Sequence, residues 1–317
     1  MKKIILGRTG LEVTELCFGA LPMGPIQKNI SVEECSELVA MALRSGINFI
    51  DTAQMYKTYE PIRRGMNRTG IKPVIATKSA AKTYEDMEKA ILEALASLDV
   101  DFIDIFLLHA ARAGVEVFEE RGAAFQCMLD YKAKGKIKAV GISTHSVKVA
   151  EMAAKVNEID IIFPIINITG KGILEGTRDE MQAAIQACLA AGKGVYLMKA
   201  LAGGTLVDDY HNAMKYVRSV SDSTPIALGM VSREELTFNL QYFETSNPVM
   251  EELPDIQQFK KRFFPVPSLC KGCKACVSTC PNYAIDMVDH KAVIHLDKCL
   301  QCGYCVGACK EFAIRMI

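Results

Sequence analysis

From Leu16 to about Phe243, a short apolar run is repeatedly followed by an amphipathic stretch. This alternation is typical of βα units that build a parallel sheet, so the chain is expected to be of the α/β class. Eight units can be counted. Their predicted strands are Leu16 to Ala20, Ile47 to Asp51, Pro73 to Lys78, Phe102 to His109, Ile137 to Ser143, Ile159 to Ile166, Gly194 to Met198 and Pro225 to Leu228.

Eight successive units fit either an open doubly wound sheet or a closed barrel. The segment CFGALPMG at the first predicted strand lacks the G-x-G-x-x-G fingerprint of an open dinucleotide-binding sheet. A (β/α)₈ TIM barrel is therefore predicted, with reactive groups at the C-terminal ends of its strands. Helix starts are predicted at Ser31 and Thr83, because Glu34 and Asp86 follow three residues later, as in a capping box.

Beyond Phe243 the pattern changes. The segment TSNPVMEELPDIQQFKKRFFPVPSL contains four prolines and no strand alternation. From Cys270 onward the chain is duplicated, since CKGCKACVSTC and CLQCGYCVGAC repeat one pattern. These shifts predict a barrel over residues 1–250, a linker or docking segment over 251–266 and a small second domain over 267–317.

The second domain is rich in cysteine. Eight of the twelve cysteines lie between Cys270 and Cys309, a crowding that indicates metal binding instead of disulfides in a reducing compartment. Each copy spells C-x₂-C-x₂-C-x₃-C, followed by Pro281 in the first copy and Lys310 in the second. This spacing favours iron-sulfur clusters over structural zinc, because tetrahedral zinc sites use two separated pairs of ligands.

The double motif resembles the bacterial two-cluster ferredoxin. The resemblance covers roughly the last fifty residues and implies an α+β ferredoxin-like domain with two [4Fe-4S] clusters. One cluster would be held by Cys270, Cys273, Cys276 and Cys309, and the other by Cys280, Cys299, Cys302 and Cys305. The four scattered cysteines are expected to be small buried apolar residues.

Four polar residues stand at or just behind consecutive predicted strand ends. Asp51 ends the second strand, Tyr56 lies in the loop behind it, Lys78 ends the third strand and His109 ends the fourth. Each alone is compatible with a structural role, but together they face one barrel mouth. Because an adjacent cation lowers the pKa of a phenol, Lys78 paired with Asp51 is predicted to make Tyr56 a better acid.

The segments NFIDTAQMYKTYE, VIATKS, IFLLHA and GKIKAVGIST stand in the order found in the aldo-keto reductases, and LGRTGLEV resembles the N-terminal hairpin of that family. The likeness spans nearly the whole barrel. It implies that Tyr56 exchanges a proton with a carbonyl or alcohol oxygen, that Lys78 and Asp51 tune it, and that His109 orients the oxygen. Hydride would pass between the substrate carbon and a nicotinamide.

The resemblance also implies nucleotide contacts, with departures from the family. Thr144 and Phe163 replace the usual Asn and Gln, and Met198 stands where a stacking tyrosine is frequent. Glu235 occupies the place of an arginine that binds a 2′-phosphate, which favours NAD over NADP. The implied cofactor-binding residues are Ser143, Thr144, Asn167, Met198, Lys199, Gly203, Gly204, Arg233 and Asn239.

The fusion of the two domains leaves three interpretations open, because hydride transfer moves two electrons and each cluster accepts one. In the first, the barrel is an active nicotinamide-dependent reductase, with clusters that are structural or serve an electron-transfer protein. In the second, it binds a flavin or another cofactor in place of nicotinamide. The third interpretation is a non-enzymatic redox relay or sensor. The intact tetrad disfavours it, because polar groups without function at a barrel mouth cost desolvation energy.

Charge and hydropathy limit the remaining partners. Lysine and arginine together number 37, as do aspartate and glutamate, so the net charge favours neither nucleic acid nor an anionic membrane. Apolar runs stay below the roughly 20 residues of a spanning helix. The segment MKKIILGRTGLEV lacks the features of a signal peptide. A cytoplasmic enzyme that acts on a small carbonyl or alcohol is therefore expected.

Overall fold

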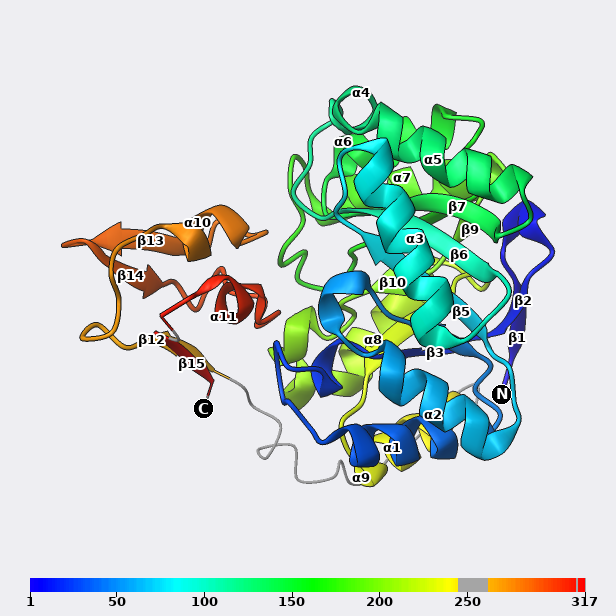
Figure 1. Ribbon diagram of the computed structural model, residues 1–317, viewed down its shortest axis with the longest axis horizontal. Helices are drawn as coiled ribbons and strands as arrows, with labels where there is room; N and C mark the ends of the chain where they lie inside the picture. Colours follow the sequence, from blue (N-terminus) through cyan, green and yellow to red (C-terminus); the bar gives the residue numbers. More distant parts are fainter. Residues whose placement is uncertain (245–261, 312, 317) are drawn as a thin grey trace.

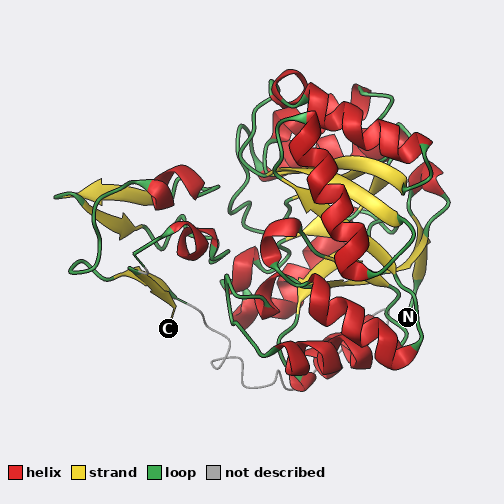
Figure 2. Ribbon diagram, viewed as in Figure 1, coloured by secondary structure: helices red, strands yellow, loops and turns green. Residues whose placement is uncertain are grey.

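The computed structural model describes residues 1–244, 262–311 and 313–316. Its main feature is a parallel sheet surrounded by helices (Figure 2). The strands follow the order β10-β11-β3-β4-β5-β6-β7-β8-β9. β9 (Gly194–Val195) and β10 (Leu197–Met198) are two parts of one strand on either side of Tyr196, so the sheet closes into a barrel.

The predicted (β/α)₈ barrel is confirmed. Every predicted strand is present, and its ends differ from the prediction by at most two residues. The match is good because strands of a parallel barrel are buried on both faces and read as continuous apolar runs. The other barrel strands are β3 (Leu16–Gly19), β4 (Phe49–Asp51), β5 (Val74–Ser79), β6 (Ile103–Ala110), β7 (Ile137–Thr144), β8 (Ile161–Pro164) and β11 (Ile226–Gly229).

Helices cover the outside of the barrel (Figure 2). Ser31 makes both hydrogen bonds of a capping box, and the side chain of Thr83 accepts from the backbone N–H of Asp86. The helices are α1 (Val32–Arg44), α2 (Tyr59–Thr69), α3 (Tyr84–Leu98), α4 (Val117–Glu120), α5 (Gly122–Ala133), α6 (Val147–Lys155), α7 (Arg178–Ala190), α8 (Tyr210–Val220) and α9 (Arg233–Glu244). Within the described ranges, every helix is too short or too polar to cross a membrane.

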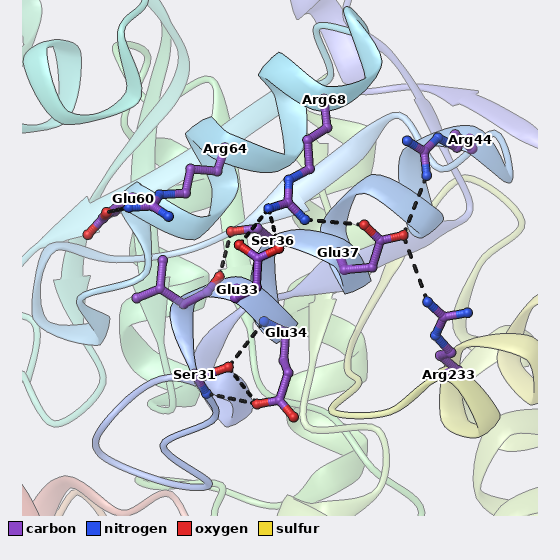
Figure 3. Close-up of polar contacts among 11 residues, drawn as sticks. Ser31, Glu33, Glu34, Ser36, Glu37, Arg44, Glu60, Arg64, Arg68 and Arg233 are labelled. Carbon is purple, nitrogen blue, oxygen red and sulfur yellow. Dashed lines mark hydrogen bonds and ion pairs between the residues drawn. The ribbon is translucent and has the colours of Figure 1, made fainter.

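Ion pairs join the outer faces of α1, α2 and α9 (Figure 3). Arg68 lies 2.6 Å from Glu33 and 3.2 Å from Glu37, and Arg233 lies 3.8 Å from Glu37. Exposed pairs of this kind contribute only about 0–1 kcal/mol each. The pair with Glu37 places the side chain of Arg233 beside α1.

One end of the barrel is closed by an antiparallel hairpin of β1 (Lys3–Ile5) and β2 (Glu12–Thr14). Leu6 and Val13 are fully buried there and belong to the same apolar cluster as Phe49 and Tyr196. The interior is thus a packed core and not a pore. The carboxyl ends of the strands form the remaining open end, where the sites of such barrels lie.

The second domain is a small α+β unit beside the barrel, with α11 on the side that faces it (Figure 1). β12 pairs with β15 and β13 pairs with β14, both antiparallel. Of the predicted linker over residues 251–266, residues 251–261 lie outside the described residues. Residues 263–265 form β12. The elements are β12 (Phe263–Pro265), α10 (Ala275–Thr279), β13 (Ile285–Val288), β14 (Lys291–Ile294), α11 (Tyr304–Ala308) and β15 (Ile314–Met316).

The pairing of β7 with β8 predicts a sharp stability effect at Gly141. A Cβ atom there would stand 1.9 Å from the carbonyl oxygen of Ile161, a backbone atom that cannot move aside. We expect Gly141→Ala to lower the free energy of unfolding by roughly 3 kcal/mol, the upper range of overpacking costs. Gly122→Ala is the matched control, because a Cβ atom there meets nothing within 4 Å. Thermal unfolding followed by circular dichroism measures both, and equal melting temperatures would contradict this strand spacing.

Candidate functional site

The four residues of the predicted tetrad converge on one cavity of about 230 Å³ at the open end of the barrel. Asp51 is the last residue of β4, and Tyr56 ends a 3₁₀ turn that begins at Gln54. Lys78 lies in β5 and His109 in β6, each one residue before its strand ends. The convergence follows from the fold, because the carboxyl ends of parallel barrel strands share one mouth.

A buried ion pair forms the base of this site. The ammonium of Lys78 donates to both carboxylate oxygens of Asp51, at 2.9 and 2.7 Å, and to the carbonyl of Thr52 at 2.7 Å. These three bonds use every donor of the ammonium. Burial raises the pKa of Asp51 and lowers the pKa of Lys78, and the ion pair opposes both shifts. Burial alone would favour the neutral form of each group, and the attraction between the two opposite charges counteracts this effect.

Tyr196 supports Asp51 and was not found by sequence reasoning. Its hydroxyl donates to Asp51 at 2.9 Å, and its ring stacks on Phe163 with 3.8 Å between ring centroids. The side chain is fully buried. Its place in the middle of the predicted strand Gly194 to Met198 was the available signal, because alternate residues of a barrel strand point inward.

The pKa of Tyr56 differs in direction from the prediction. Lys78 lies 4.9 Å from the centroid of the Tyr56 ring, so the expected cation is present. Nevertheless, burial raises the pKa of Tyr56 well above its ordinary value, and Tyr304 and Asp51 raise it further. The phenol therefore stays protonated at neutral pH. The prediction of an acidified Tyr56 is wrong for this arrangement, because it left out desolvation and the second phenol.

His109 is a neutral imidazole in this site. Burial lowers its pKa well below the ordinary value, and the positive charge of Lys78 lowers it further. Its backbone carbonyl accepts from Arg121 at 3.0 Å, which fixes the end of β6. A neutral imidazole donates from one ring nitrogen and accepts at the other, so His109 can orient an oxygen without carrying charge.

Tyr304 of the second domain enters the barrel site. Its hydroxyl lies 3.3 Å from the hydroxyl of Tyr56 and 3.1 Å from Nε2 of His109. It stands between Cys302 and Cys305 in the second cysteine motif and begins α11. Sequence reasoning missed this residue. The available signal was that the first copy of the motif has the small Ala275 at the matching position.

Six of the nine predicted nucleotide-binding residues line the cavity. The other three are not among the lining residues and bond to groups of the protein. Thr144 accepts from the N–H of Ser146 at 3.0 Å, and the Asn167 amide donates to the carbonyl of Lys171 at 2.9 Å. Arg233 pairs with α1, as described above. The six lining residues are Ser143, Met198, Lys199, Gly203, Gly204 and Asn239.

Two polar groups beside these residues complete the cavity. His145 is buried and lines the cavity next to Ser143. Burial lowers the pKa of His145 well below its ordinary value, and a side-chain hydrogen bond with Asn282 of the second domain opposes this shift. At the far end, the carboxylate of Glu235 accepts from the N–H of Val231 at 2.5 Å and also lines the cavity.

The eight motif cysteines line two further cavities, four in each. One is lined by Cys270, Cys273, Cys276 and Cys309, and the other by Cys280, Cys299, Cys302 and Cys305. Backbone N–H groups of Ala284, Gln301 and Ala313 donate to sulfur atoms at 3.2 to 3.4 Å, as is usual around iron-sulfur clusters. In the described part of the chain, no three His, Cys, Asp or Glu side chains stand close enough to bind one metal ion. Four cysteines around a cavity suit a larger group than a single ion.

Several enzymes are similar to part of this chain. It is 29% identical over 152 residues to L-galactose dehydrogenase of Arabidopsis thaliana, 28% over 115 residues to methylglyoxal reductase of Escherichia coli and 30% over 139 residues to glyoxal reductase of Bacillus subtilis. These matches cover 44%, 35% and 40% of this chain and 47%, 41% and 49% of those proteins. The chain thus spans less than half the length of each relative.

Solved structures are similar in fold over most of the chain. An aldo-keto reductase of Bacillus halodurans in its holo form has a TM-score of 0.64 at 20% identity, with 81% of this chain and 96% of that chain covered. The Bombyx mori aldo-keto reductase in complex with NADP has a TM-score of 0.59 at 16% identity, with coverages of 77% and 88%. At these identities the likeness concerns the fold alone.

Family models match both parts of the chain. The model of the aldo/keto reductase family matches residues 15–261, a range that contains the whole tetrad. A model described as a 4Fe-4S dicluster domain matches residues 264–310, a range that contains all eight motif cysteines. The chain therefore belongs to the aldo/keto reductase family and carries a 4Fe-4S dicluster domain behind its barrel.

Proposed function

We propose that this protein reduces a small carbonyl compound to the alcohol, with a nicotinamide as hydride donor and Tyr56 as proton donor. The observation that carries the proposal is the position of the Tyr304 hydroxyl, 3.3 Å from Tyr56 and 3.1 Å from His109. That atom stands in for the substrate oxygen. A carbonyl oxygen at the same point would accept hydrogen bonds from both groups, as general acid catalysis of its reduction requires.

The pKa directions suit the reduction of a carbonyl. Tyr56 keeps its proton at neutral pH, because burial raises its pKa, and the substrate oxygen would take this proton as it gains negative charge. His109 is neutral, and its Nε2–H tautomer would donate to the same oxygen. Lys78 keeps a positive charge 4.9 Å from the Tyr56 ring, which stabilises the phenolate that remains.

Polar groups of the cavity would hold a nicotinamide cofactor. Ser143 and His145 line the cavity close together and would contact the carboxamide. Gly203 and Gly204 would offer the phosphates their backbone, and Asn239 would contact the adenine. When bound, this cofactor supplies the hydride. The flavin alternative stays a prediction without support from the relatives named above.

Charge at the adenine end favours NADH over NADPH. Glu235 lines the cavity there, and a carboxylate repels a 2′-phosphate. Arg233, the cation that could offset this repulsion, is paired with Glu37 of α1. We therefore infer a preference for NADH. This agrees with the preference for NAD over NADP that the sequence predicts.

The substrate class follows from the cavity and the relatives. The cavity of about 230 Å³ is at the small end for ligand pockets, which favours a small substrate. Two of the relatives are named for glyoxal and methylglyoxal reduction. We infer that small aldehydes and dicarbonyl compounds are the substrates of this chain as well.

The cysteine sets are the proposed ligands of two [4Fe-4S] clusters, four thiolates to each. The amide-to-sulfur hydrogen bonds around them support this assignment. The clusters would supply one-electron transfer, and an electron-transfer protein is the proposed partner. Cys302 lines both its own cavity and the barrel cavity, so the second set adjoins the proposed substrate site.

Removal of the Tyr56 hydroxyl tests the proton-donor role. We expect Tyr56→Phe to reduce kcat for methylglyoxal with NADH by roughly 100- to 10,000-fold, the usual contribution of a general acid. Tyr59→Phe is the matched control, since it removes a buried hydroxyl that bonds Thr77 at 2.7 Å outside the cavity. The control should lose about 1 kcal/mol of stability and keep its turnover. NADH oxidation at 340 nm under steady-state conditions measures both variants. Full turnover by Tyr56→Phe would contradict the role of Tyr56 as proton donor.

Iron content tests the ligand sets. We expect Cys273→Ser and Cys302→Ser each to lower the iron of anaerobically purified protein from roughly eight to roughly four atoms per chain, since each removes one ligand of a different cluster. Cys188→Ser is the control, because this buried thiol donates to the carbonyl of Ala150 at 3.4 Å and a hydroxyl can replace it. Eight irons in either ligand variant would refute its place in the set.

A further inference from the structure

The second domain approaches the barrel mouth by backbone contact. A Cβ atom on Gly303 would stand 2.0 Å from the carbonyl oxygen of Ile26, and one on Gly203 would stand 1.7 Å from the carbonyl oxygen of Leu300. One of these glycines belongs to the domain and the other to the barrel. Only residues without side chains permit such close approach, so both surfaces are shaped for this contact.

Side chains hold the same contact. Leu300 of the second domain is 2% exposed and belongs to the apolar core cluster of the barrel. The Gln27 amide donates to the carbonyl of Cys302 at 3.1 Å, and Arg112 donates to the carbonyl of Ser278 at 2.7 Å. The position of Tyr304 in the barrel site is therefore set by an anchored interface and not by one side chain.

We propose that Tyr304 is an internal competitor of the substrate, which the docked iron-sulfur domain inserts into the oxygen site formed by Tyr56 and His109. The inference rests on the proposed function, which assigns that site to a carbonyl oxygen. The Tyr304 hydroxyl fills it at 3.3 and 3.1 Å from the two groups, so a second oxygen cannot occupy it. A carbonyl compound binds only when this phenol withdraws, and the position of the domain thus controls access to the reductase site.

Cluster binding does not require a tyrosine at this position. In the first copy of the motif, Lys274 and Ala275 stand where the second copy has Gly303 and Tyr304. Both copies start a short helix at that place, and both residues before it have a left-handed backbone, with φ of 62° for Lys274 and 79° for Gly303. The glycine and the tyrosine are thus specific to the second copy, whose Tyr304 enters the barrel cavity.

Tyr304→Phe tests the proposal, because it removes the competing oxygen and keeps the ring. We expect KM for methylglyoxal to fall by about three- to tenfold without a decrease in kcat, since the substrate no longer displaces two hydrogen bonds. Tyr283→Phe is the matched control in the same domain, where the 53% exposed tyrosine lies outside the cavity. An unchanged or higher KM, or a lower kcat, in Tyr304→Phe would overturn the proposal.

A second measurement does not depend on turnover. Acetamide offers a carbonyl oxygen that is not reduced, and ligand-observed NMR titration gives its Kd for the cluster-loaded protein. We expect Tyr304→Phe to bind acetamide about three- to tenfold more tightly than the wild type, and Tyr56→Phe/Tyr304→Phe to lose this gain. Equal affinity in Tyr304→Phe and the wild type would overturn the competition. If methylglyoxal is not reduced at all, the proposed function fails, and this titration still decides the role of Tyr304.

Gly303→Ala tests the part played by docking. Its Cβ atom meets the carbonyl of Ile26, whereas the motif itself accepts a side chain there, as Lys274 demonstrates in the first copy. We expect full iron content, an acetamide Kd lowered by the same about three- to tenfold factor and a lower KM, because the domain carries Tyr304 away from the mouth. Wild-type affinity in this cluster-loaded variant would contradict control by the domain.

Discussion

Two hydrogen bonds, from Tyr304 to Tyr56 and to His109, connect the 4Fe-4S dicluster domain to the proposed proton-transfer groups of the barrel. They depend on a constraint of the barrel. Closure brings the ends of β4, β5 and β6 to one mouth, and the buried pair of Lys78 and Asp51 fixes a charge beneath that mouth. Any oxygen placed between Tyr56 and His109 then meets a protonated phenol, a neutral imidazole and a nearby cation. The state of the site therefore depends on whether the Tyr304 hydroxyl or another oxygen lies between these two residues.

Contact between the two domains places the Tyr304 hydroxyl at this point. The cysteine motif makes a short helix start at Tyr304, and the glycine before it lets the helix reach the backbone of the barrel loop. Leu300 adds apolar burial in the barrel core, which is a non-directional source of affinity. The short helix that follows the second cysteine of each motif copy thus also brings the phenol of Tyr304 into the barrel cavity in the second copy. Cys302 and Tyr304 of the 4Fe-4S dicluster domain form part of the lining of the proposed substrate site.

Much of this arrangement could be predicted from the sequence, because it depends on local pattern. Apolar runs gave every barrel strand to within two residues, and the strand ends placed Asp51, Lys78 and His109 together. The resemblance of the double motif to two-cluster ferredoxins implied the two sets of four cysteines that line separate cavities. These features follow from periodicity and from the rule that parallel strand ends share a face.

What could not be predicted depends on contacts between distant segments. Tyr304 lies 248 residues from Tyr56 in the chain. The contrast with Ala275 in the first copy marks Tyr304 as unusual, but it does not indicate which distant residues this tyrosine contacts. The raised pKa of Tyr56 follows from that meeting and from burial, so the expected acidification was wrong. Arg233 stays a predicted nucleotide contact; its guanidinium lies 3.8 Å from Glu37 of α1, an ion pair between helices that the sequence did not predict.

The most direct test of the account is an anaerobic crystal structure of the cluster-loaded protein with nicotinamide, determined with and without acetamide. Without acetamide, we expect the Tyr304 hydroxyl to lie between Tyr56 and His109. With acetamide, we expect its carbonyl oxygen at that point and Tyr304 displaced. Acetamide bound to Tyr56 and His109 while Tyr304 keeps its place would contradict the account, as would a first crystal in which Tyr304 lies outside the barrel mouth.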